Sequence, residues 1–151
     1  MPASSTSRST TRRPPLRLLK EVPLFSGLTR PQLSRVADLA QEVSYGAGRM
    51  LVRAGTPGLA FYVIVDGTAK VVRGRISSAK GRATLRAGDF FGEMALLDGG
   101  PRTASVVAET PLTTVRVERA PFRRMLKDEP EIALKLLEGM AARMRTMAES
   151  L

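Results

Sequence analysis

The chain has 151 residues, 43% of them hydrophobic, and a formal net charge of +10. This length and apolar content suffice for one folded domain with a core of ordinary size, and a second folded domain is not expected. Neither cysteine nor histidine occurs in the sequence, which excludes disulfides and thiolate chemistry, removes the commonest general base and metal ligand, and argues against an enzyme or a metal site.

The N-terminal segment is basic and poor in apolar side chains. Residues 1–20 hold five cations and no acid, which is half of the net charge of the chain. Residues 1–15 are rich in Ser, Thr, Arg and Pro, and such a segment cannot bury enough surface to offset the entropy lost on ordering. We therefore predict a disordered basic leader over residues 1–15 and a single domain over residues 16–151.

Two helices are predicted before the middle of the chain. Residues 16–22 follow two prolines and favour a short helix. A second helix begins at Thr29, because Thr29 and Gln32 have the spacing of a capping box, and it ends before Gly46. No apolar stretch reaches the ~20 residues of a membrane-spanning helix, and no apolar signal-peptide segment is present, so we expect no membrane span and a cytoplasmic protein.

The middle of the chain, residues 46–117, has the pattern of β structure. Short β-rich runs alternate with glycine turns, as in an all-β sandwich or barrel. Asp66 and Gly67 form a tight-turn signal that predicts a hairpin between two of the runs. The predicted strands are residues 50–52, 61–65, 68–72, 83–85, 105–108 and 113–117.

Two further helices are predicted after the β-rich region, a short one over residues 121–127 and a longer one that opens at residues 128–131. The longer helix carries apolar residues at alternating steps of four and three, which places them in one seam. The seam indicates an amphipathic helix with a partner, either the core of its own domain or a second copy in a coiled-coil homodimer. Its residues are Ala133, Leu137, Met140, Met144, Met147 and Leu151.

Residues 91–106 carry the groups best suited to bind an anion. Gly92 lets the backbone approach a ligand closely, and one helical turn over residues 93–97 leaves N-terminal amides available for a phosphate. Arg102 suits a phosphate because its planar guanidinium donates two parallel hydrogen bonds and keeps its charge. Thr103 adds a hydroxyl donor beside it.

Glu93 decides between two interpretations of this segment. A carboxylate beside a phosphate is repulsive unless it accepts a hydrogen bond from a ribose hydroxyl, as acidic residues do in dinucleotide sites, so a sugar phosphate fits better than a bare phosphate. In the alternative, Glu93 caps a helix and forms an ordinary salt bridge with Arg102. From these residues alone both interpretations stay open.

The pattern resembles the cyclic nucleotide-binding domain shared by catabolite activator proteins, protein kinase A regulatory subunits and cyclic nucleotide-gated channels. The resemblance covers most of residues 18–148 and is strongest where Phe-Gly-Glu, an apolar helix and Pro-Arg-Thr-Ala-Ser-Val follow one another. It implies a mainly β fold with flanking helices: an eight-stranded β jelly-roll (double-stranded β-helix) with N-terminal helices and a C-terminal lid helix. It also implies a sensor that transmits ligand occupancy through its C-terminal helix, with cAMP favoured over cGMP as ligand and no cofactor.

The resemblance further implies roles for individual residues. Glu93 would bind the ribose 2′-hydroxyl. Arg102 would bind the cyclic phosphate, and backbone amides near Gly92 and Ala95 would bind the same phosphate. Met140 or Arg143 of the last helix would cover the purine. The residues expected to contact the ligand are Gly92, Glu93, Met94, Ala95, Arg102, Thr103 and Ala104.

Three positions depart from the family pattern. Thr56 and Leu59 stand where acidic residues are usual, and Met94 replaces a branched aliphatic residue. None of these departures removes a phosphate ligand.

Nucleic-acid binding through the basic leader, with the β domain as a degenerate scaffold, is the competing hypothesis. We expect no DNA-reading helix-turn-helix, because nothing after Leu151 supplies one. The downstream protein partner is not identified by the sequence.

Overall fold

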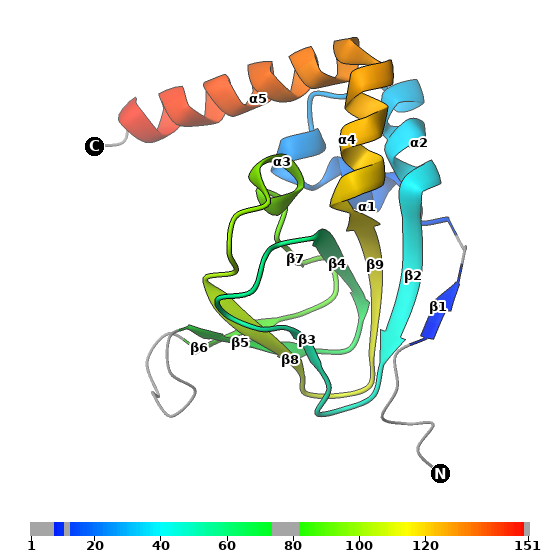
Figure 1. Cartoon of the computed structure of the whole chain (residues 1–151), viewed down its shortest axis with the longest axis vertical. Coiled ribbons are helices and arrows are strands. Elements are labelled where there is room, and N and C mark those ends of the chain that lie inside the picture. The colour runs from blue at the N-terminus through cyan, green and yellow to red at the C-terminus, as the bar shows by residue number, and fades with distance from the viewer. Residues whose placement is uncertain (1–7, 11–12, 74–81, 150–151) are drawn as a thin grey trace.

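The computed structural model describes residues 8–10, 13–73 and 82–149. Within them the chain forms two antiparallel sheets, and helices gather at one end of these sheets (Figure 1). The strands are β1 (Arg8–Thr10), β2 (Ala40–Tyr45), β3 (Met50–Val52), β4 (Ala60–Asp66), β5 (Ala69–Arg73), β6 (Arg82–Leu85), β7 (Phe90–Phe91), β8 (Ala104–Ala108) and β9 (Leu112–Glu118). Their order is β1-β2-β9-β4-β7 in one sheet and β3-β8-β5-β6 in the other.

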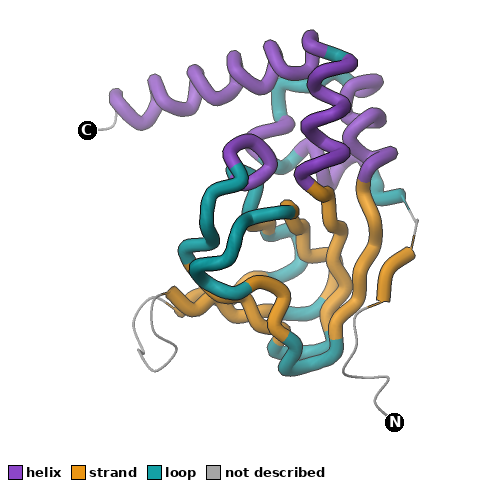
Figure 2. Tube along the Cα trace, viewed as in Figure 1, coloured by secondary structure: helices purple, strands orange, loops and turns teal. Residues whose placement is uncertain are grey.

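Six short or medium helices complete the described part of the chain. They are α1 (Leu16–Lys20), the 3-10 helix η2 (Pro23–Phe25), α2 (Arg30–Leu39), α3 (Ala95–Asp98), α4 (Arg119–Asp128) and α5 (Pro130–Glu149). Figure 2 shows that all of the helical segments lie toward one end of the strands, and that α5 extends away from them. The predicted mainly β fold with flanking helices is therefore confirmed, with β2 to β9 forming the eight-stranded roll.

The capping box predicted at Thr29 is present. Thr29 Oγ1 accepts a hydrogen bond from the Gln32 amide at 3.3 Å, and the Thr29 amide donates to Gln32 Oε1 at 2.9 Å. The helix that follows ends at Leu39, and the chain continues directly into β2, which the sequence analysis did not predict. Pairing with β9 along the whole of β2 gives these residues their strand conformation.

Two expectations differ from the structure. The predicted hairpin at Asp66 and Gly67 is wrong, because β4 and β5 belong to different sheets: β4 already has β9 and β7 on its two sides, so the turn carries the chain from one sheet to the other. The leader was predicted to be disordered over residues 1–15, yet Arg8–Thr10 pair with β2. Residues 1–7 and 11–12 of that leader, and Leu151 of the seam, lie outside the described residues.

The core consists of two hydrophobic clusters. One joins the helices to the outer side of the first sheet, and its largest buried side chains include Phe25, Phe61 and Phe122, with Phe25 and Phe61 edge to face at 5.6 Å. The other fills the roll itself, around residues such as Tyr62 and Ile64. Helix α3 contributes Leu96 to the helical cluster, and β4 supplies side chains to both clusters.

Candidate ligand-binding site

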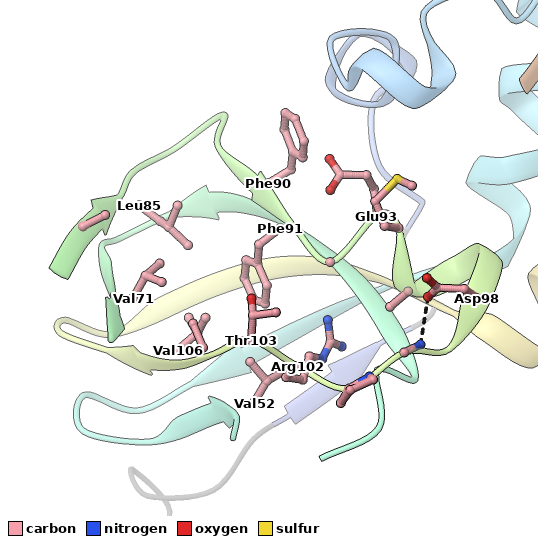
Figure 3. Close-up of a pocket in the computed structure, with 17 residues that line it drawn as sticks. Val52, Val71, Leu85, Phe90, Phe91, Glu93, Asp98, Arg102, Thr103 and Val106 are labelled. Carbon is pink, nitrogen blue, oxygen red and sulfur yellow. Dashed lines mark hydrogen bonds between the residues drawn. The ribbon is translucent and has the colours of Figure 1, made fainter. Parts of the chain in front are cut away.

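A pocket of about 670 Å³ opens between α3, the loop that follows it and the interior of the roll. Figure 3 shows the side chains that surround it. It brings together all seven residues that the sequence analysis expected around the phosphate and ribose. The lining residues are Val52, Val71, Ala83, Leu85, Phe90, Phe91, Gly92, Glu93, Met94, Ala95, Asp98, Gly100, Pro101, Arg102, Thr103, Ala104 and Val106.

The pocket has an apolar end and a polar end. The side chains of Val71, Leu85 and Val106 lie together at the β5 and β6 end, whereas Glu93 and Asp98 lie at the α3 end (Figure 3). A ligand with a flat apolar part and an anionic, hydroxyl-bearing part matches this division.

Gly92 turns the chain from β7 into α3. Its φ of +84° lies in the left-handed region that favours glycine, and a Cβ at this position would collide with Arg102 Nη1 and lie 3.0 Å from the carbonyl oxygen of Ala60. The Ala95 amide donates to the Gly92 carbonyl at 3.0 Å. That amide would therefore have to share or lengthen this bond in order to contact a phosphate.

Arg102 is held in place by the backbone around it. Its Nη2 donates to the Ala60 carbonyl at 2.5 Å, and its own amide and carbonyl are bonded to Thr56 and Gly55, both at 2.8 Å. Burial lowers the pKa of the Arg102 guanidinium from its ordinary value, because the charged form loses hydration, while the nearby Tyr62 acts in the opposite direction. The side chain is thus a partly desolvated cation directed at the pocket.

Glu93 and Arg102 line the same pocket but do not form an ion pair in the described part of the chain. Glu93 does not cap a helix either, because α3 begins at Ala95, two residues later than predicted, and its N-cap is Met94, which makes no side-chain capping bond. The alternative in which Glu93 caps a helix and forms a salt bridge with Arg102 is therefore wrong for this structure. Both charged groups stay available to a ligand.

The remaining predicted contact residues surround these two charges. Thr103 is exposed at the mouth of the pocket beside Arg102, and Ala104 begins β8. Met94 is 45% exposed at the rim of the pocket.

The two residues predicted to cover the purine lie elsewhere. Met140 is partly buried against the helical cluster, and Arg143 is exposed on α5. Neither lines the pocket, and α5 points away from the roll (Figure 1). A covering role for either residue would need α5 to move.

Three features in and around the pocket were not predicted: its apolar end, the glycine packed under Ala95, and the acid that fixes the loop. The apolar end comes from β3, β5, β6 and β8, where inward and outward side chains alternate, but a pattern of this kind does not show which strands face a pocket. Gly58 is buried under Ala95, and a Cβ there would lie 2.5 Å from the Ala95 Cβ. Asp98 accepts a hydrogen bond from the Gly100 amide at 2.8 Å and fixes the loop that carries Arg102.

Within the described ranges, no helix is both long and apolar enough to cross a membrane. The same residues contain no group of three or more acidic side chains arranged to hold a metal ion.

Residues 42–129, more than half of the chain, match the family described as the cyclic nucleotide-binding domain. Similar curated proteins include the cAMP-dependent protein kinase regulatory subunit of Aspergillus fumigatus, 43% identical over 112 residues, and that of Schizosaccharomyces pombe, 42% identical over 110 residues. Each alignment covers 72% of this chain and 26% of the relative. The chain therefore spans about a quarter of the length of these relatives.

Solved structures with a similar fold include both bacterial and eukaryotic proteins. The N-terminal domain of a transcriptional regulator from Streptomyces coelicolor has a TM-score of 0.80 at 29% identity and covers 89% of this chain and 96% of that one. The regulatory domain of Toxoplasma gondii protein kinase A, solved with cAMP, has a TM-score of 0.62 at 27% identity and covers 85% of this chain and 48% of that one. The fold, the pocket and the sequence match together show that this chain belongs to the cyclic nucleotide-binding domain family.

Proposed function

We propose that the pocket binds a cyclic nucleotide, with cAMP favoured over cGMP, and that the chain is a receptor domain rather than an enzyme. The observation that carries the proposal is that Glu93 and Arg102 line one pocket without pairing with each other. Arg102 suits a cyclic phosphate, and Glu93 suits a ribose hydroxyl. The apolar end beyond them suits a purine.

The other predicted contacts fit around this arrangement. In the proposed complex the phosphate lies against Gly92 and the start of α3, near Met94 and Ala95. Thr103 adds its hydroxyl to the same end, and Ala104 leaves space beside it. Phe91, which stacks on Tyr62 at 4.9 Å, forms a rigid wall between the two ends.

Two observations support cAMP as the ligand. The similar curated proteins are named as cAMP-dependent kinase regulatory subunits, and one similar structure contains cAMP. Thr103 does not discriminate, because a hydroxyl serves either nucleotide through the phosphate. No cofactor is needed for binding alone, and a hydrolytic reaction lacks both a histidine base and a metal-ligand cluster among the described residues.

Helix α5 is the proposed output element. Its inner side packs Ile132 and Leu136 into the helical cluster, whereas Leu137 and Met144 are exposed. We propose that ligand binding changes the position of α5, either bringing Met140 or Arg143 over the purine or altering a homodimer formed through the exposed residues. Light scattering of the wild type and Leu137→Lys, each with and without cAMP, separates these two outputs.

Calorimetry with cAMP and with cGMP tests the proposal directly. The wild-type chain should bind at micromolar protein concentration, and Arg102→Ala should bind at least about 100-fold more weakly. Arg124→Ala is the matched control, since Arg124 is an exposed arginine of α4 outside the pocket. Absence of wild-type binding would refute the proposed function, and titration with nucleic acid would then test the basic leader, much of which lies outside the described residues.

A further inference from the structure

The C-terminal end of α3 is bonded to α4 by two arginines. The Leu97 carbonyl accepts a hydrogen bond from Arg119 Nη2 at 3.4 Å and another from Arg123 Nη1 at 3.2 Å. Carbonyls at a helix C-terminus have no intrahelical partner, and cations are favourable there. Arg119 and Arg123 are four residues apart on α4, so their side chains lie on one side of that helix.

Gly99 shows how closely Arg119 packs against this end of α3. Gly99 ends the helix with a φ of +64°, and a Cβ built on it would lie 2.9 Å from both Cζ and Nε of Arg119. The Arg119 guanidinium therefore rests on the turn itself. Its Nε is buried and has no hydrogen-bond partner among the described residues, so the position of this side chain is set by the turn rather than by an acid.

Arg119 also reaches the other side of the pocket through its backbone. Its amide donates to the Leu59 carbonyl at 2.8 Å. The residue before Leu59, Gly58, donates its own amide to the Gly100 carbonyl at 2.9 Å. The first residue of α4 is thus bonded both to α3 and to Leu59, whose neighbour Gly58 bonds to the loop that carries Arg102. No other residue of α4 has hydrogen bonds to both segments in the described structure.

We propose that Arg119 and Arg123 are positioning residues that convert ligand binding at α3 into movement of α4 and α5. The inference rests on the proposed function of the pocket. A ligand that draws Gly92 and α3 toward Arg102 displaces the Leu97 carbonyl, and the two guanidinium groups carry α4 with it. Apolar contacts of Leu96 also link α3 to α4, but apolar side chains can slide past one another. Hydrogen bonds to a single carbonyl are directional, so they fix the direction in which α4 follows α3.

The experiment measures hydrogen exchange of the full chain with and without saturating cAMP, alongside calorimetric affinity. Arg123→Gln is the first variant, because Arg123 is exposed and its replacement leaves the buried packing intact. Arg119→Gln with Arg123→Gln is the second, Arg123→Lys tests for rescue, and Arg124→Gln is the matched control on the same helix. Unfolding temperatures confirm that each variant folds.

In the wild type and in Arg124→Gln, cAMP should slow exchange in α3, α4 and α5. In Arg123→Gln, and more so in the double variant, cAMP should still slow exchange in α3, whereas the exchange rates in α4 and α5 should stay within about twofold of the ligand-free rates. The affinity for cAMP should fall by less than about tenfold. Arg123→Lys should restore part of the effect.

Three results would overturn the inference. If cAMP slows exchange in α4 and α5 of the variants as much as in the wild type, the two arginines do not transmit ligand binding. If the wild type binds cAMP without any change in α4 and α5, there is no movement to transmit, although the proposed function stands. If the wild type binds neither nucleotide, the proposed function itself fails and the transmission role falls with it.

Discussion

The guanidinium of Arg102 occupies the space that a side chain at Gly92 would need. A Cβ on Gly92 would collide with Arg102 Nη1, and Gly92 has a φ of +84°. The same residue therefore supplies the left-handed turn into α3 and the space in which the arginine lies. Sequence motifs place these residues ten positions apart, but their contact is a product of the fold.

Replacing Gly92 by alanine should impair both features. Strain at positive φ costs ~1–3 kcal/mol of unfolding free energy, and displacement of Arg102 should weaken cAMP binding by at least about tenfold, or ~1.4 kcal/mol. Thermal unfolding and calorimetry measure the two effects separately. Gly48→Ala is the control, since Gly48 has a φ of +86° with no atom within 4 Å of its Cβ position. An equal loss of affinity in both variants would show that the Arg102 contact is not the cause.

Arg102→Ala should reduce the affinity for cAMP by at least about 100-fold. A charge-assisted bond contributes ~1.5–3 kcal/mol, and a bidentate guanidinium makes two of them. Arg102→Lys should recover only part of the loss, because an ammonium group cannot donate two parallel bonds. If lysine restored full affinity, charge alone would explain binding. Stability should change less than affinity, since the half-buried side chain of Arg102 gives the fold one hydrogen bond, to the Ala60 carbonyl, and alanine keeps the backbone bonds.

Two adjacent leucines of α5 should respond very differently to substitution. Leu136 is 2% exposed and packs in the helical cluster, whereas Leu137 is 60% exposed. Leu136→Ala should lower the unfolding free energy by ~2–5 kcal/mol through the cavity that it leaves, and Leu137→Ala by less than ~0.5 kcal/mol. Urea unfolding at low protein concentration measures both. A large loss for Leu137→Ala would mean that this side of α5 is covered in solution.

Tyr45 should make the fold sensitive to alkaline pH. Burial raises the pKa of its phenol, the neighbouring Tyr62 acts in the same direction, and Arg116 opposes them. The unfolded chain loses this proton as pH rises through the ordinary pKa of ~10 while the folded protein retains it, so the free energy of unfolding falls from there upwards. Urea unfolding at about pH 8 and about pH 11 should show a smaller fall in the free energy of unfolding for Tyr45→Phe than for the wild type. The same fall in both proteins would assign the effect to other groups.

The sequence predicts this fold well wherever the signal is local. The capping box at Thr29 and the start of a helix at Pro130 depend on neighbouring residues, and both helices are present. Strands β2 and β7 were missed because their conformation depends on pairing with β9 and β4, which are distant in the chain. Arg8–Thr10 were missed for a similar reason, since an edge strand forms through backbone bonds that composition does not reveal.

The candidate site was predictable in part. Residues 91–106 are contiguous, so their resemblance to a known segment was sufficient to find Glu93 and Arg102. The apolar end could not be found in this way, because Val52, Val71 and Leu85 come from three separate strands. The covering roles of Met140 and Arg143 stay a prediction, since helix periodicity specifies a face but not where the helix points.

The two hydrophobic clusters share no buried residue, although β4 contributes side chains to both. Side chains around the apolar end of the pocket, such as Val71 and Leu85, pack against the roll cluster, while those that hold α5 belong to the helical one. Substitutions of Val71 or Leu85 and substitutions of the residues that hold α5 therefore change different parts of the core. In the proposed receptor, this wall of the pocket can therefore be altered without altering the packing that holds α5.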